Sequence, residues 1–220
     1  MPRNAGDQTT VTARVEESAG IVQPGTGPSG LPGVLLTGSE PFRCSEKQLG
    51  MTLLNFWKWS ESDLLNSLTR TRLAEFIVAT ALGAHAEGPR DERSALELVT
   101  EDGVEVRVRS GSFLKSFHQR DFSKVAFIPQ VRPSHSREGS ARPASCRVLV
   151  HVFALLDHVE RGTVDPLDLD QWRFFVPPTS KLEALLTTQH AITVPTLDQL
   201  SRGSVSYQDL RAAVRNAVGS

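Results

Sequence analysis

The residues best placed to do chemistry lie on one predicted strand, over residues 104–110. Three valines alternate there with Glu105, Arg107 and Arg109, the period-two pattern of a strand with one buried and one polar face. Residues two apart on a strand share a face, so we expect the two guanidinium groups to lie side by side. Such a pair can grip phosphate or neutralise nearby carboxylates, and the sequence leaves both roles open.

Two carboxylates are expected close to this arginine pair. Metal-assisted cleavage of a phosphodiester needs carboxylates converging on Mg²⁺ and a lysine near the attacking water. A helical glutamate, an acid on one strand of a hairpin and a Glu-x-Lys on the next strand are the usual donors, and Glu75, Glu97, Arg107 and Arg109 occupy those places in order. Arginine is neither a metal ligand nor a usable base, so the pattern predicts a cleavage site that has lost its chemistry.

The elements that must position these residues follow from the periodicity. A helix is predicted near residues 53–65, and a second one begins after Thr69 and ends at Gly83. Strands over 94–100 and 104–110 should form a hairpin, because Asp102-Gly103 is a strong turn signal. Further strands are predicted at 124–128, 148–156 and 172–176, with helices from Thr179 and over 207–218. This order predicts an α/β fold with a mixed β-sheet flanked by helices.

Composition divides the chain into two parts. Residues 1–41 contain seven of the sixteen glycines, five of the thirteen prolines and no aromatic residue. We therefore expect a disordered Gly/Pro-rich tail over 1–47 and one folded domain over 48–220. Two distant cysteines imply neither a disulfide framework nor a zinc site. The absence of a long apolar run or a secretory signal predicts a cytoplasmic protein that does not interact with membranes.

Several motifs carry a resemblance to a known family. They are F-W-K-W-S-E-S-D-L-L at 56–65, R-L-A-E-F-I-V-A at 72–79, L-E-L-V-T-E-D-G at 96–103, V-R-V-R-S-G-S-F-L-K-S-F-H-Q at 106–119, V-F-A-L at 152–155 and V-D-P-L-D-L-D-Q-W-R-F-F-V at 164–176. In this order they resemble uncharacterised bacterial restriction-endonuclease-like proteins of the PD-(D/E)XK nuclease superfamily. The resemblance spans about residues 51–186 and implies a restriction-endonuclease-like domain with a Mg²⁺-dependent cleavage site.

The chain departs from that family where the chemistry would sit. The resemblance implies an aspartate at Glu97, a glutamate at Arg107 and a lysine at Arg109, and only Glu75 is unchanged. A shift of two residues would let Glu105 serve as the strand carboxylate instead. We therefore expect no cofactor and no metal, with Glu75 and Glu97 as the ligands if any bind; Mg²⁺ would be required only if the chain were catalytic. Glu75 is read as a vestigial metal ligand or, preferably, as a partner of the arginines.

Charge is spread unevenly along a chain whose net charge is only −1. Residues 104–147 hold nine Lys or Arg against three acidic residues, which suits a surface that meets phosphate. The leading hypothesis is a catalytically degenerate nuclease-fold protein that binds DNA or RNA through Arg107, Arg109, Lys115 and Arg120. The alternatives are an active Mg²⁺-dependent endonuclease using Glu75, Glu97 and Glu105, or a non-enzymatic module that binds another protein.

The three tryptophans are expected in or near the core rather than as platforms for nucleic-acid bases: Trp57, Trp59 and Trp172. Asp165, Asp168 and Asp170 belong to an acidic stretch over residues 157–170, in a segment that resembles the family. We expect them to stabilise turns and cap a helix.

Overall fold

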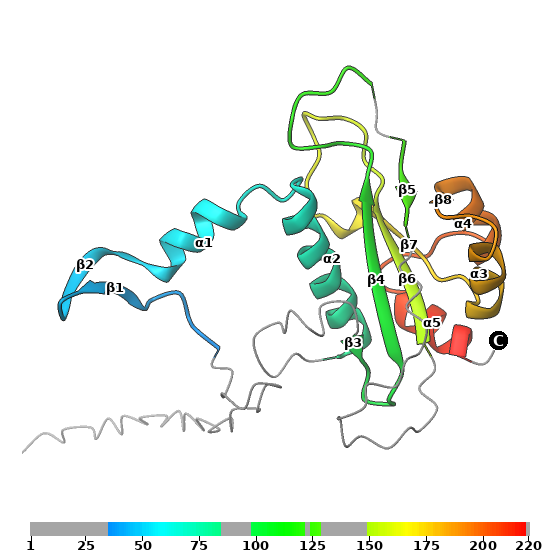
Figure 1. Ribbon diagram of the computed structural model, residues 1–220, viewed down its shortest axis with the longest axis horizontal. Coiled ribbons are helices and arrows are strands. Elements are labelled where there is room, and N and C mark those ends of the chain that lie inside the picture. The colour runs from blue at the N-terminus through cyan, green and yellow to red at the C-terminus, as the bar shows by residue number, and fades with distance from the viewer. Residues whose placement is uncertain (1–34, 85–97, 122–123, 129–148, 219–220) are drawn as a thin grey trace, which may run out of the picture.

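The computed structural model describes residues 35–84, 98–121, 124–128 and 149–218. The chain contains both helices and strands, packed together, so the predicted α/β class is confirmed (Figure 1). The elements are β1 (Pro41–Cys44), β2 (Lys47–Thr52), α1 (Leu53–Glu61), α2 (Ser67–Leu82), β3 (Leu98–Val99), β4 (Glu105–Ser112), β5 (Ala126–Phe127), β6 (Leu149–Leu156), the 3-10 turn η1 (Leu169–Gln171), β7 (Trp172–Phe175), α3 (Thr179–Leu186), β8 (Ile192–Thr193), α4 (Val194–Ser201) and α5 (Leu210–Val218).

A four-stranded sheet in the order β3-β4-β6-β7 organises the chain. The pairing of β4 with β6 is parallel and runs unbroken from Glu105↔Leu149 to Ser112↔Leu156, whereas β3 and β7 pair antiparallel at the two edges. The prediction of a mixed sheet is therefore confirmed. The apolar run predicted as a central strand is β6, which is buried almost throughout.

The hairpin that leads into β4 turns where the sequence predicted. Leu98 pairs with Val106 and Val99 with Glu105. Gly103 makes the turn at φ 81°, a conformation that costs glycine little, and its N–H donates to Thr100 O at 2.9 Å. Residues 94–97 of the predicted first strand lie outside the described residues, and Glu97 is among them.

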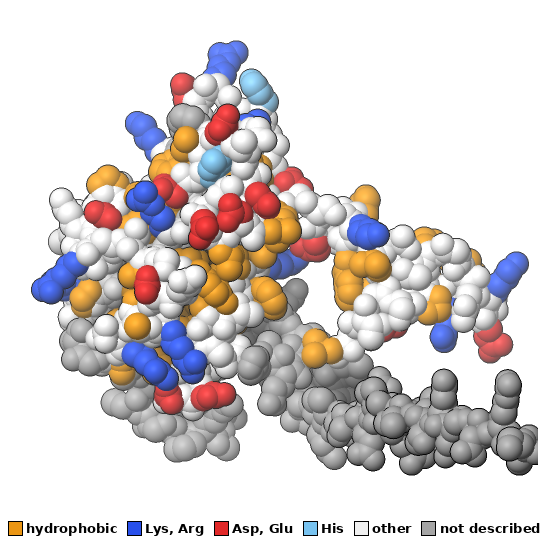
Figure 2. All heavy atoms as spheres, turned by 180° about the vertical axis from the view of Figure 1, so that it is seen from behind, with side chains coloured by type: hydrophobic (Ala, Val, Ile, Leu, Met, Phe, Trp, Pro, Cys, Tyr) orange, Lys and Arg blue, Asp and Glu red, His pale blue; other side chains and the backbone are white. Residues whose placement is uncertain are grey.

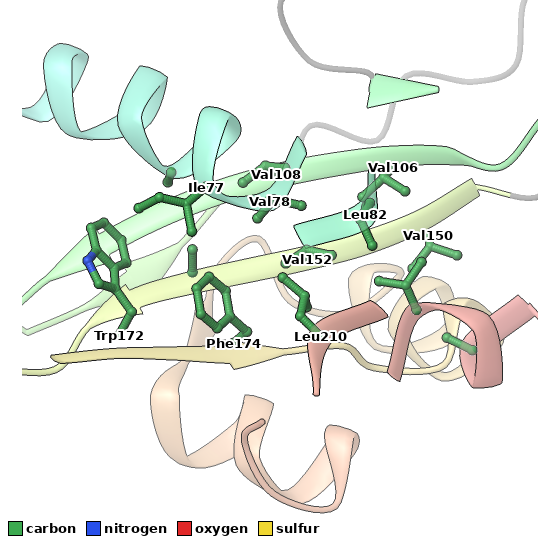
Figure 3. Close-up of a cluster of buried hydrophobic side chains, with 14 of the residues drawn as sticks. Ile77, Val78, Leu82, Val106, Val108, Val150, Val152, Trp172, Phe174 and Leu210 are labelled. Atoms are coloured by element: carbon green, nitrogen blue, oxygen red, sulfur yellow. The ribbon is translucent and has the colours of Figure 1, made fainter. Parts of the chain in front are cut away.

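Two helices bury one face of this sheet. Figure 3 shows Ile77, Val78 and Leu82 of α2 directed at the sheet, where they pack on valines of β4 and β6. From β7 the aromatic rings of Trp172 and Phe174 complete the same cluster, and α5 adds Leu210. On β4 this face carries Val106 and Val108, each no more than 1% exposed, so the predicted alternation of buried and polar positions is confirmed.

The opposite face is covered by β5, β8, α3 and α4 (Figure 1). Phe153 and Leu155 of β6 are fully buried there, with Leu182 of α3 and Leu197 of α4. The strand predicted at 124–128 corresponds to β5. It does not join the main sheet but pairs antiparallel with β8, an element that the sequence analysis missed together with α4.

Helix α2 carries Glu75 and has well-defined ends. Its N-cap is Asn66, whose Oδ1 accepts the N–H of Leu68, so the helix begins before the predicted start at Thr69. It ends as predicted, with Gly83 in the left-handed region at φ 68°. Near its beginning, the Thr71 and Ser110 hydroxyl groups share a hydrogen bond of 3.0 Å, which fixes the helix against β4.

Residues 35–61 form an arm that extends from the main body (Figure 1). Its β1–β2 hairpin corrects the predicted tail over 1–47, because residues 41–44 are already paired with β2; residues 1–34 lie outside the described residues. The Glu40 carboxylate accepts the N–H groups of Thr37 and Gly38, and these hydrogen bonds lower the pKa of Glu40 to about 2. Gly38 in turn packs against the Trp57 ring.

Gly111 of β4 provides a test of how β5 covers the sheet. A Cβ atom there would lie 2.7 Å from Val125 Cγ1 and 2.8 Å from Phe127 Cζ. We predict that Gly111→Ala lowers the free energy of unfolding by about 1–3 kcal/mol, because a methyl group forced into a packed site displaces its neighbours. Gly162→Ala is the matched control, since no atom lies within 4 Å of its added Cβ. Equal urea midpoints for the two variants would contradict this packing.

Candidate functional site

The two arginines project from the polar face of β4, as the alternation predicted. Arg107 and Arg109 are both partly exposed, and they share this face with Glu105. Across the parallel pairing, Arg107 lies opposite His151 and Arg109 lies opposite Phe153 on β6. The face is thus apolar toward the carboxyl ends of the strands. Toward their amino ends it carries the charged side chains.

His151 also belongs to this site, although the sequence favoured a purely structural role for it and did not place it beside the arginines. It is only 6% exposed and stacks on Phe153, with ring centroids 6.2 Å apart. Burial lowers the pKa of His151 to about 4, and the positive charges of Arg107 and Arg109 add to this shift. The histidine is therefore neutral at pH 7. A signal was present in the sequence, because His151 is the single polar residue within the run V-L-V-H-V-F-A-L-L.

The electrostatic balance at Arg109 shows which charge dominates. Burial lowers the pKa of Arg109, the neighbouring Arg107 lowers it further, and Glu75 raises it by less than Arg107 lowers it. Of these two charges, Arg107 has the larger effect on the pKa of Arg109. Arg109 thus lies near both a second cation and the Glu75 carboxylate.

Glu75 lies on α2, is 8% exposed, and is close enough to Arg109 to change its pKa. This proximity fits the interpretation of Glu75 as an electrostatic partner of the arginines. Of the four positions predicted for a degenerate site, three are therefore near one another, while Glu97 is outside the described residues. Glu105 lies on the same face of β4 as the arginines. The hypothesis that Glu105 serves as the strand carboxylate, after a shift of two residues, requires this position.

No metal site is evident in the described part of the chain. Among those residues, no group of three His, Cys, Asp or Glu side chains could hold a metal ion. The donor set around β4 is instead two guanidinium groups and a neutral imidazole, which offer N–H donors to an anion.

Lys115 and Arg120 lie beyond the carboxyl end of β4, in a loop that is fixed by hydrogen bonds. Gln119 Oε1 accepts the N–H of Lys115, and Arg161 donates to the carbonyl groups of Lys115 and Phe117. Burial lowers the pKa of Lys115, and so does the charge of Arg70, a cation of α2 that the sequence analysis did not single out. Arg120 is exposed.

The remaining sequence expectations have mixed outcomes. Trp172 is buried and donates its indole N–H to Pro166 O, as expected of a core tryptophan. Trp59 is 83% exposed, so the expectation of a core position is wrong for this residue. Asp165 and Asp168 accept the N–H groups of residues two positions later, which confirms the expected turn and capping roles.

Comparisons with known proteins place the chain in no family. No family model, no curated protein and no solved structure matches it. In the described residues, no helix is both long and apolar enough to cross a membrane.

The depressed pKa of His151 predicts an acid-dependent loss of stability. An unfolded chain takes up a proton at His151 near pH 6.5, whereas the folded chain does so only near pH 4. Stability conferred by the neutral imidazole is therefore complete above about pH 6.5 and falls as the pH decreases toward 4, by about 2–3 kcal/mol.

Substituting His151→Gln should remove this part of the pH dependence, since an amide does not titrate. Urea unfolding between pH 4 and 7 measures it, and His190→Gln, at an exposed position, is the control. If the free energy of unfolding of His151→Gln depends on pH as steeply as that of the wild type, the histidine is not the group responsible.

Proposed function

We propose that this chain binds the phosphate backbone of nucleic acid through Arg107 and Arg109, on a restriction-endonuclease-like fold that has lost its cleavage chemistry. The observation that carries the proposal is the pair of guanidinium groups on one face of β4, so close together that the charge of Arg107 lowers the pKa of Arg109. Phosphate is the abundant biological anion that such a surface recognises without reading bases.

The fold supports the proposal through the order of its elements. A helix that carries a buried glutamate precedes an antiparallel hairpin, and the second strand of that hairpin carries the paired side chains. This strand pairs in parallel with β6 at the centre of a mixed sheet. That arrangement is the one that the resemblance to PD-(D/E)XK nucleases implies, with Arg107 and Arg109 standing where the Glu-x-Lys pair would be.

Charge argues against a working cleavage site at this position. A guanidinium group about 4 Å from a cation repels it by about 4 kcal/mol per unit charge at an effective dielectric of 20, and Mg²⁺ carries two charges. Arginine also stays protonated, so Arg109 cannot deprotonate an attacking water molecule as a lysine with a lowered pKa could. The same charges favour a phosphate group.

Spacing along β4 suits an extended ligand. At about 3.3 Å per residue, the strand covers roughly 17 Å between Arg107 and its end at Ser112, after which the loop with Lys115 and Arg120 begins. Consecutive phosphates of one strand of a duplex rise about 3.4 Å along the axis, so this length corresponds to roughly five of them. Because Val125 and Phe127 cover the strand at Gly111, a nucleic-acid backbone would meet both groups of cations only by passing around these side chains.

We predict that Arg107→Gln combined with Arg109→Gln weakens binding of a fluorescein-labelled 20-nucleotide DNA by about tenfold or more at 100 mM salt. The slope of log affinity against log salt should decrease in magnitude by about two, because each phosphate contact contributes nearly one unit. Fluorescence anisotropy between 50 and 200 mM salt measures both quantities, on single-stranded and duplex DNA and on RNA of the same sequence.

The matched control is Lys181→Gln, which removes an exposed cation from α3 and should leave the affinity and the slope unchanged. Wild-type affinity that is absent or independent of salt would contradict nucleic-acid binding. Nicking of a supercoiled plasmid by the wild type with Mg²⁺ would instead support the endonuclease that uses Glu75, Glu97 and Glu105, provided that Glu105→Gln abolishes the nicking.

A further inference from the structure

The arm of residues 35–61 is apolar but poorly covered. Helix α1 has nine residues and buries none of them, and a helix of this length is marginal in water unless other parts of a protein pack on it. Phe56 is 45% exposed and Trp59 83%, and their ring centroids lie 6.3 Å apart, so the two rings form one patch on the helix. An apolar patch of this kind is normally covered by a partner.

The outer face of α2 is a second apolar surface. Leu68 is 70% exposed and Phe76 66% exposed, and Arg72 lies between them at a spacing of four residues, so all three share one side of the helix. Figure 2 shows hydrophobic side chains both along the arm and on the adjoining part of the main body. Arg72 also forms an ion pair of 2.7 Å with Glu61, at the base of the arm.

We propose that the arm docks on the outer face of α2 in a second copy of the chain, and that the second copy returns the same contact. The two surfaces would then form a symmetric dimer by exchange of arms. This proposal is independent of the proposed nucleic-acid binding, because it uses neither β4 nor the loop that follows it.

The exposed area is sufficient for such a dimer. If a whole aromatic side chain offers about 200 Å², the exposed fractions of Phe56, Trp59 and Phe76 amount to roughly 400 Å² per chain. A standard interface buries about 800 Å² per partner, of which somewhat more than half is apolar. Leu54, which is 45% exposed, and Leu68 add to this apolar area. One chain therefore exposes about as much apolar area as one partner buries in a standard interface.

A second copy explains both surfaces at once. A contact with two-fold symmetry needs its two halves on the same chain, and here the arm and the α2 face are those halves. Among the described residues, the Arg72–Glu61 ion pair ties the arm to its own body, and it is about half exposed; such pairs contribute about 0–1 kcal/mol. Exchange of the arm between copies therefore costs the monomer little.

Sedimentation equilibrium of the full chain between about 1 and 100 μM tests the proposal. We expect the wild type to approach twice the monomer mass of 24.1 kDa. Trp59→Ser and Phe76→Ser should each raise the dimer dissociation constant at least tenfold, because each removes an aromatic anchor from both contacts. Both side chains are exposed in the chain described here, so the variants should fold, as circular dichroism checks.

Leu167→Ser is the control, since Leu167 is 66% exposed but belongs to neither surface, and it should leave the dimer intact. A mixture of the Trp59→Ser and Phe76→Ser chains should dimerise more strongly than either variant alone, because the mixed dimer keeps one intact arm-on-α2 contact. A wild type that is monomeric at 100 μM overturns the proposal. So does a mixture that gains nothing, or a dimer that neither substitution weakens.

Discussion

The parallel pairing of β4 with β6 is the constraint on which the rest of this structure depends. Parallel strands at the centre of a sheet are normally covered on both faces, and here α2 and α5 cover one face while β5, β8, α3 and α4 cover most of the other. The register also sets Arg107 beside His151 and Arg109 beside Phe153. Two cations are thereby held on a strand whose neighbours are largely apolar.

Holding guanidinium groups in such a place requires a compensating interaction. Burial opposes the charge of Arg109 and of His151 alike, and the histidine responds by staying neutral, whereas an arginine cannot. Glu75 offsets part of the charge, yet Arg107 has the larger effect on Arg109. An anionic ligand would add to this compensation, which is the basis of the proposed phosphate binding. In a nuclease of the resembled type, a glutamate in place of Arg107 would attract Mg²⁺, and a lysine would stand in place of Arg109.

Much of the fold followed from local patterns in the sequence. The alternation in β4, the Asp102-Gly103 turn, the Gly83 helix end and the apolar run of β6 each depend on neighbours close in sequence, and each is confirmed. Pairing between distant segments was not predictable in this way. The position of β5, which pairs with β8, depends on the close approach of Val125 and Phe127 to Gly111, and the exposure of Trp59 depends on an arm that leaves the body. The position of His151 beside Arg107 likewise depends on the register of β6 against β4.

The central claim is that Arg107 and Arg109 contact phosphate, and side-chain NMR tests it most directly. Arginine Nε–Hε signals of the ¹⁵N-labelled chain would be followed during titration with a DNA oligonucleotide, and assigned through single Arg→Lys variants. The account predicts that the signals of Arg107 and Arg109 shift with DNA, while that of Arg173, which pairs with Asp157 at 2.7 Å, stays in place. Unchanged Arg107 and Arg109 signals in DNA-saturated protein would contradict the account.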